Sequence, residues 1–173
     1  MGKELKLATE IAEPGAKKML EFSLADSDLE TQHVIGVLIR ERLISYEEAK
    51  LLEGNRTNLD RCRGLEYLHH HSEMELYNLA IIKGAPFTPI QEDIMNRFHG
   101  VLKKGGHLIV ELDTQRPELL SKRYSASFFR PIERYLEERY HRRKARKMYE
   151  SVMKRIGFRN FKNYQSLLIA EKN

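Results

Sequence analysis

The residues with the clearest chemical pattern are the cations of a predicted helix around positions 130–147. Arginine and lysine bind phosphates, and aromatic rings beside them stack on bases, so this pattern suits RNA or DNA. The nucleic-acid candidates are Arg130, Arg134, Arg139, Arg142, Arg143, Arg146 and Lys147. Acidic residues in the same helix, such as Glu133 and Glu137, are spaced to form ion pairs with neighbouring arginines. A purely structural, solvent-exposed helix face therefore stays open beside nucleic-acid binding.

The charge of the chain is divided unevenly along its length. Residues 116–162 hold 15 Lys and Arg against 5 Asp and Glu, a net charge of +10, whereas the whole chain carries +5. The remainder is therefore acidic, at −5. A basic segment of this kind attracts nucleic acid or an anionic membrane surface.

A second group with chemical potential is the run His69-His70-His71, which has Glu73 and Glu75 nearby. Imidazoles and carboxylates are metal ligands. Adjacent histidines, however, point in different directions on a helix or strand, and no remote set of ligands accompanies them. We therefore expect a polar loop and no metal site.

Length and composition indicate what kind of chain carries these residues. The 173 residues can form one domain with a real core, and we expect a single domain over 1–173. The content of 41% hydrophobic and 32% charged residues is typical of a soluble protein, and no apolar run approaches the ~20 residues of a membrane span. The N-terminus lacks the apolar core of a signal peptide, and the single Cys62 excludes an internal disulfide. A cytoplasmic location is expected.

The first half of the chain is predicted to be mainly helical. A short strand over 17–24 precedes a helical segment over 27–71, in which two helices begin at the capping boxes Ser27–Glu30 and Ser45–Glu48. The pair could be a helix-turn-helix, but its second helix is acidic, which disfavours DNA. No second or third strand is predicted between 45 and 75.

The second half alternates strands and helices. A continuous apolar run over 76–82 predicts a strand buried on both faces. The elements that follow are a helix over 90–102 that ends at Gly105-Gly106, a strand over 107–112, an amphipathic helix over 127–156 and an antiparallel strand pair over 159–170. The order predicts an α/β fold. Ligands of open α/β sheets bind outside the carboxyl ends of the strands. This rule places Lys83, Pro86, Phe87, Glu111 and Asp113 at the ligand-binding rim, and the family resemblance described next implies that they face the substrate.

Three stretches resemble class I S-adenosylmethionine-dependent methyltransferases. Leu102–Val110 resembles the "L-K-P-G-G" turn of that family, Gly157-Phe158 with the strand pair up to Lys172 resembles its C-terminus, and Leu76–Ile82 stands where its fourth strand lies. The resemblance covers 76–173. It implies a Rossmann-like, methyltransferase-type sheet reduced to about five strands, with a helical N-terminal half and an antiparallel C-terminal strand pair.

The same resemblance implies a cofactor site after the first strand. The family has an acidic residue there, followed by a glycine-rich loop that lets the backbone approach S-adenosylmethionine closely. Glu21 matches the acidic position, and small residues stand where glycines are usual. The implied cofactor-binding residues are Glu21, Ser23, Ala25, Ser27 and Asp28. Pro86-Phe87 also matches the end of the "N/D-P-P-F/Y" loop of enzymes that methylate nucleobase amines, whereas Lys83 and Ala85 differ from it.

Two functions are open from the sequence. The first is an S-adenosylmethionine-dependent methyltransferase-like protein, either active or catalytically degenerate. The alternative is a non-enzymatic basic module that binds nucleic acid or a protein partner. A cofactor-binding loop at 21–28 favours the first, and salt-sensitive RNA or DNA binding without cofactor affinity favours the second.

Overall fold

The centre of the protein is one mixed β-sheet, seen in a computed structural model that describes residues 17–23, 31–54, 59–62, 68, 74–86, 90–112 and 130–173. Within these residues the sheet has six strands in the order β2-β1-β3-β4-β6-β5. The strands are β1 (Met19–Ser23), β2 (Leu59–Cys62), β3 (Tyr77–Ala85), β4 (Leu102–Leu112), β5 (Phe158–Tyr164) and β6 (Leu167–Lys172). The chain therefore has the predicted α/β architecture, with a Rossmann-like sheet.

The strand directions define where a ligand would bind. β2, β1, β3 and β4 run parallel to one another, while β6 runs antiparallel to both β4 and β5. The chain leaves β1 toward β2 on one side and then returns to β3 on the other side of β1. Such a reversal is a topological switch point, where α/β sheets bind ligands at the carboxyl ends of their strands. We call the edge at which β1, β2, β3 and β4 end the carboxyl rim, and the opposite edge the amino rim.

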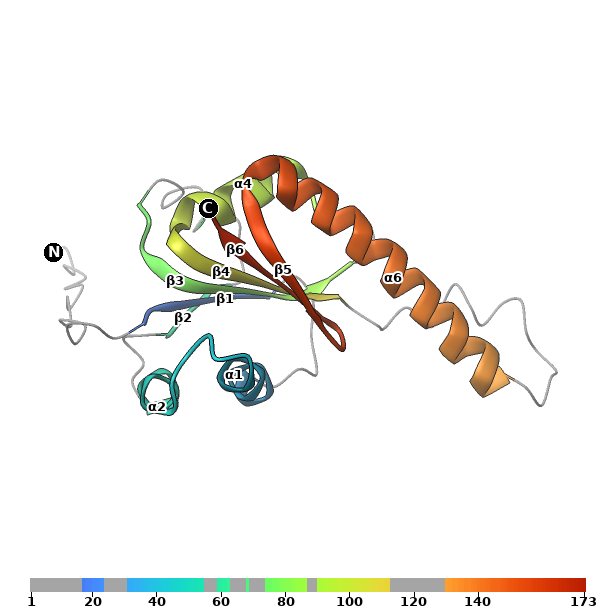
Figure 1. Cartoon of the computed structure of the whole chain (residues 1–173), viewed down its shortest axis with the longest axis horizontal. Coiled ribbons are helices and arrows are strands. Elements are labelled where there is room, and N and C mark those ends of the chain that lie inside the picture. The colour runs from blue at the N-terminus through green and yellow to red at the C-terminus, as the bar shows by residue number, and fades with distance from the viewer. Residues whose placement is uncertain are drawn as a thin grey trace, which may run out of the picture.

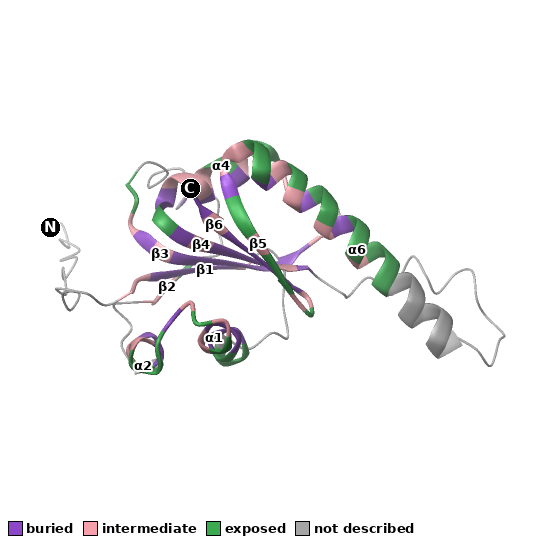
Figure 2. Ribbon diagram, viewed as in Figure 1, coloured by how far each residue is buried: buried purple, intermediate pink, exposed green. Residues whose placement is uncertain are grey.

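Helices cover both faces of the sheet (Figure 1). The helices α1 (Thr31–Arg40) and α2 (Tyr46–Gly54) lie against one face, and α4 (Glu92–Val101) and α6 (Arg130–Ile156) lie against the other. Figure 2 shows β3, β4 and β6 largely buried between these layers, whereas β5, at the edge of the sheet, is mostly exposed. Because side chains alternate along a strand, Leu20 and Phe22 join the core under α4 and α6, while Met19 joins the core under α1 and α2. Glu21, between them in register, belongs to the α1/α2 face.

Local signals explain the helical hairpin of α1 and α2. The Ser45 amide donates a hydrogen bond of 2.7 Å to the Glu48 carboxylate, and the Glu48 amide donates one of 3.1 Å to the Ser45 hydroxyl. This reciprocal pair is the predicted capping box at the start of α2. The other predicted box, at Ser27, lies outside the described residues.

The strand β2 corrects the prediction that no strand lies between residues 45 and 75. It is short, and Asp60 and Arg61 interrupt any apolar run, so the sequence carries only a weak strand signal. Backbone pairing with β1 stabilises this strand, since Met19 to Phe22 align with Leu59 to Cys62. The described sheet consequently has six strands and not about five.

The double glycine also differs from the prediction, because α4 ends at Val101 and the extended Leu102 already begins β4. Gly105 and Gly106 lie inside β4, in an irregular stretch between the pairs Tyr77–Leu102 and Leu79–His107. Gly105 has a φ of 72°, and a Cβ on Gly106 would lie 2.8 Å from the Lys103 carbonyl oxygen. The glycines therefore allow a bulge at the amino rim, in contact with the start of β3.

The C-terminal third follows the sequence closely. α6 ends at Ile156, Gly157 adopts a φ of 116°, and β5 begins at Phe158. The antiparallel pair of β5 and β6 is confirmed. None of the helices in the described ranges is long and apolar enough to cross a membrane.

Candidate functional site

An ion pair joins β1 and β3 near the carboxyl rim. Ser23 aligns with Lys83, and Glu21 aligns with Ile81, so the side chains of Glu21 and Lys83 emerge on the same face two residues apart. Lys83 Nζ lies 3.2 Å from Glu21 Oε1, and the two side chains are only 10% and 9% exposed. Arg61, on β2, places its Nε 3.7 Å from the same oxygen. Three neighbouring strands thus meet at one carboxylate.

A second carboxylate stands on the next strand of the sheet. The Gly84 amide donates a hydrogen bond of 3.0 Å to Glu111 Oε2. Gly84 has a φ of 65°, a conformation that favours glycine, and it lies where the register of β3 and β4 shifts between Ile82 and Ala85. This local irregularity aims the amide of β3 at the carboxylate of β4 and holds Glu111 at the rim.

Together these groups form a charged cluster at the switch point, which we define as Glu21, Lys83 and Glu111. It offers two carboxylates and one ammonium group on the α1/α2 side of the sheet. Such a set matches a ligand that carries both an ammonium and a carboxylate, because each pairs with an opposite charge through charge-assisted hydrogen bonds. The amino-acid portion of S-adenosylmethionine has this chemistry, so the donor set fits that portion of the cofactor.

The ribose portion has no corresponding acid among the described residues. In the family that the sequence resembles, the second strand ends in an acidic residue for the ribose hydroxyls. The described end of β2 carries Arg61 and Cys62. Asp60 lies two residues earlier and accepts a hydrogen bond from the Tyr77 hydroxyl, and Lys18 Nζ lies 3.1 Å from it. Asp60 therefore makes its contacts, with Tyr77 and Lys18, near the amino rim.

The structure brings part of the predicted site together. Glu21, Ser23, Lys83 and Glu111 lie on three adjacent strands at or near the carboxyl rim. The other predicted residues of the two loops, namely Ala25, Ser27, Asp28, Phe87 and Asp113, lie outside the described residues, as do His69 to His71 and the side chains of Arg130 and Arg134.

Pro86 is held by α6. The Tyr149 hydroxyl donates a hydrogen bond of 2.9 Å to the Pro86 carbonyl oxygen, and Tyr149 is fully buried. Burial raises the pKa of the Tyr149 hydroxyl far above its ordinary value, so the group stays a neutral donor. Pro86 therefore follows the end of β3 at a position fixed against the helix.

The apolar pattern predicted for the helix over 127–156 runs through Met148 and leaves out Tyr149, so sequence reasoning missed Tyr149. Met148 is 40% exposed, whereas Tyr149 packs in the core with Ala145 and Met153. The spacing of four residues between Ala145, Tyr149 and Met153 carries the correct signal. One residue along a helix turns the side chain by about 100°, so an error of one position moves a residue from the surface into the core.

Comparison with solved structures places this architecture among known proteins. The chain is similar to the CurJ carbon methyltransferase, with 15% identity and a TM-score of 0.50, over 95% of this chain and 50% of that one. It is similar to the DszA carbon methyltransferase with 16% identity and a TM-score of 0.50, over 94% of this chain and 49% of that one. The chain thus spans about half the length of each.

Comparisons at the level of sequence give no match. No family model matches the chain, and no curated protein matches it. The resemblance in the second half of the sequence, the strand order and the structural neighbours nevertheless agree with one another. The chain has the Rossmann-like fold of class I S-adenosylmethionine-dependent methyltransferases.

Proposed function

We propose that the chain binds S-adenosylmethionine at the carboxyl rim and acts as a methyltransferase-type protein. The observation that carries the proposal is the convergence of Glu21, Lys83 and Glu111 from three adjacent strands at the switch point of a methyltransferase-like sheet. Charged groups of both signs are expected where a zwitterionic ligand binds.

Each residue of the cluster has a defined part in this proposal. The Lys83 ammonium pairs with the carboxylate of the cofactor, and Glu111 accepts hydrogen bonds from its amino group. Glu21 orients the Lys83 ammonium from a distance of 3.2 Å. When bound, the cofactor supplies an activated methyl group, and transfer depends mainly on alignment of the acceptor. The segment after Lys83 would face that acceptor.

Calorimetric titration with S-adenosylmethionine and S-adenosylhomocysteine tests the proposal. We expect micromolar binding to the unmodified chain and its loss in the double variant Glu21→Gln/Lys83→Met, which removes both charges of the pair. The matched control is Lys17→Met/Glu48→Gln, because Lys17 Nζ and Glu48 form an ion pair of similar length, 3.3 Å, that is more exposed and lies on the amino side of β1. The control should bind as the unmodified chain does.

One observation favours a second candidate, a chain that keeps this fold without binding the cofactor. Glu21 and Lys83 already satisfy each other and are about nine-tenths buried, and Ser23 occupies a position where the family has glycine. Folded protein that shows no binding at millimolar ligand would support this second candidate and overturn the first.

A further inference from the structure

The outer face of α6 carries several exposed cations and one exposed tyrosine that the cofactor site does not use. The exposed residues that form it are Tyr140, Arg143, Lys144, Lys147 and Lys154, which we call the cationic face. Their spacing of three, four and seven residues places them on one side of the helix. The opposite side, with Ala145, Tyr149 and Met153, is buried against the sheet. The cationic face is thus directed away from the core by the packing of α6.

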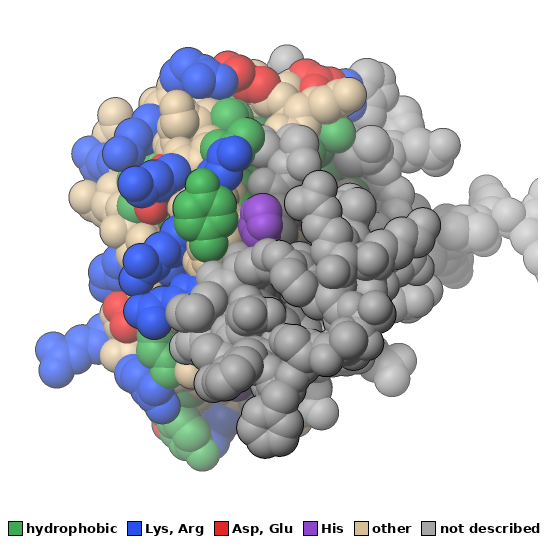
Figure 3. All heavy atoms as spheres, turned by 90° about the vertical axis from the view of Figure 1, so that its right-hand side faces the viewer, with side chains coloured by type: hydrophobic (Ala, Val, Ile, Leu, Met, Phe, Trp, Pro, Cys, Tyr) green, Lys and Arg blue, Asp and Glu red, His purple; other side chains and the backbone are tan. Residues whose placement is uncertain are grey.

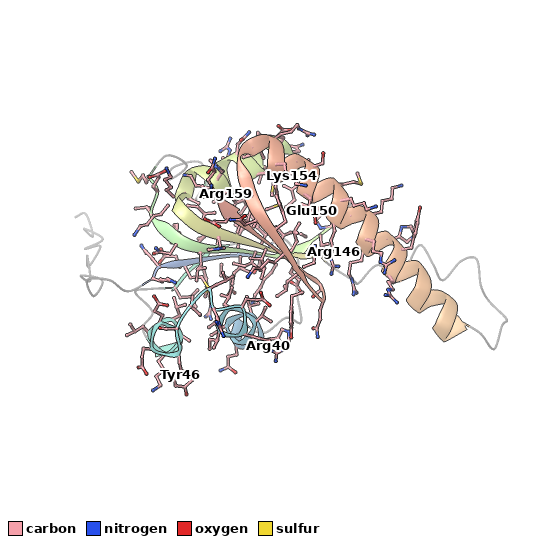
Figure 4. All side chains as sticks on the ribbon, in the orientation of Figure 1. Arg40, Tyr46, Arg146, Glu150, Lys154 and Arg159 are labelled. Carbon is pink, nitrogen blue, oxygen red and sulfur yellow. The ribbon has the colours of Figure 1, made fainter. Side chains whose placement is uncertain are left out.

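Acidic residues are nearly missing from residues 139–156, the part of this helix whose side chains the structure describes. Between residues 139 and 156, Glu150 is the single acidic residue, and it is turned toward β5, where it accepts a hydrogen bond of 3.3 Å from Asn163. Figure 3 shows that Lys and Arg far outnumber Asp and Glu among the coloured side chains of this side of the molecule. Figure 4 labels Arg146, Glu150 and Lys154 at successive turns of α6, and Arg159 on neighbouring β5.

Among the described side chains, like charges act on Arg146 from two neighbours, and Glu150 opposes them. Burial lowers the pKa of Arg146, and the neighbouring charges of Arg142 and Arg143 lower it further, while Glu150 raises it. The Nε of Arg146 is buried and has no hydrogen-bond partner among the described residues. An anionic ligand laid along the helix would relieve this repulsion.

Part of the cationic face lies on the turns of α6 that pass the carboxyl rim. Because the Tyr149 hydroxyl bonds to Pro86, directly after β3, the turns before Tyr149 continue past the carboxyl end of that strand. Lys147, Arg143 and Tyr140 lie on these turns, and Tyr140 is nine residues, about 13 Å of helix, before Tyr149. Figure 1 shows α6 extending beyond the edge of the sheet.

We propose that the cationic face binds single-stranded nucleic acid, with backbone phosphates on Arg143, Lys144, Lys147 and Lys154 and a base stacked on Tyr140. Between residues 143 and 154 the cations cover about 16 Å, enough for several phosphates of one strand. Tyr140 is 63% exposed on this face, and an exposed ring beside cations favours a strand whose bases are unpaired. The proposal does not depend on cofactor binding.

Fluorescence anisotropy with labelled single-stranded RNA and DNA of about 20 nucleotides tests this proposal, with duplex DNA as a comparison. We expect affinity to fall steeply as salt rises from about 50 mM to about 200 mM. The triple variant Arg143→Gln/Lys144→Gln/Lys147→Gln should reduce the salt slope by about 2, at about 0.7 for each phosphate that the protein no longer neutralises. Tyr140→Ala should weaken binding roughly five- to a hundredfold, whereas Tyr140→Phe should retain it.

The matched control removes three exposed lysines elsewhere, as Lys50→Gln/Lys103→Gln/Lys104→Gln. It lowers the net charge by the same amount and should keep most of the affinity. Equal decreases in affinity for both triple variants would show unspecific attraction and overturn the proposal. Binding to polyglutamate or to anionic lipid vesicles as tight as binding to RNA would overturn it too, in favour of a protein or membrane partner. RNA preferred over DNA, or the reverse, identifies the natural strand.

Discussion

Replacing Glu21 by Gln keeps the shape of the side chain but removes the carboxylate that lies 3.2 Å from the Lys83 ammonium, in a site that is about nine-tenths buried. Breaking a buried ion pair by removal of one partner costs about 3–5 kcal/mol, because one desolvated charge remains. Since Lys83 retains slight exposure, we place the loss of unfolding free energy for Glu21→Gln at about 3 kcal/mol. Lys83→Met should cost less, about 2 kcal/mol, because Arg61 remains 3.7 Å from the Glu21 carboxylate.

The double variant provides the decisive comparison. Removing both charges takes away the whole pair and leaves neither of its members as a buried ion, so Glu21→Gln/Lys83→Met should lose only about 1–2 kcal/mol and not the sum of about 5 kcal/mol. Urea unfolding followed by circular dichroism measures these values. With an m-value of about 2 kcal/mol/M, Glu21→Gln should shift the midpoint by about 1.5 M. Single-variant effects that add to within about 0.5 kcal/mol would refute the ion pair as the link between β1 and β3.

Three further predictions concern the elements around this pair. Gly106→Ala should destabilise the protein by about 2 kcal/mol or more in thermal melts, because the added Cβ would lie 2.8 and 3.0 Å from backbone carbonyl oxygens. Gly105→Ala should cost about 1 kcal/mol in the same melts, because the added Cβ has open space but the φ of 72° is unfavourable for alanine. Tyr149→Phe removes the hydrogen bond to Pro86 and should cost about 1–2 kcal/mol in urea unfolding, and an unchanged midpoint would exclude that bond. Burial lowers the pKa of His107, so the unfolded chain takes up its proton at a higher pH than the folded one. Stability should therefore fall as the pH drops from about 7.5 to about 5.5, and His107→Gln should flatten this dependence in urea midpoints.

The sequence predicts the second half of the fold well, because β3, β4 and β6 each contain a run of apolar residues typical of a buried strand. β3 and β6 are buried along almost their whole length, and α4 shows a clear apolar stripe. β2 escapes prediction for the opposite reason. It has four residues, two of them charged, and its stability comes from pairing with β1, which lies about 40 residues earlier.

The candidate site also combines features that the local sequence predicts with features that depend on pairing between distant strands. Topology alone indicates that Lys83 and Glu111 lie near the carboxyl ends of their strands. The ion pair between Glu21 and Lys83 depends on the register of β1 against β3, and the sequence does not encode that register locally. The resemblance therefore indicates the rim at which these three charges converge, whereas the partners of each charge become visible only in three dimensions.

The most direct test of the central claim is a nuclear magnetic resonance titration of ¹⁵N-labelled protein with S-adenosylhomocysteine. Gly84 lies in the proposed site and donates its amide to Glu111, whereas Gly105 lies in the bulge at the opposite rim. If the carboxyl rim holds the cofactor, the Gly84 amide should shift with ligand concentration and the Gly105 amide should stay in place. A spectrum unchanged at millimolar ligand, or shifts confined to the amino rim, would contradict the assignment of the cofactor to this site.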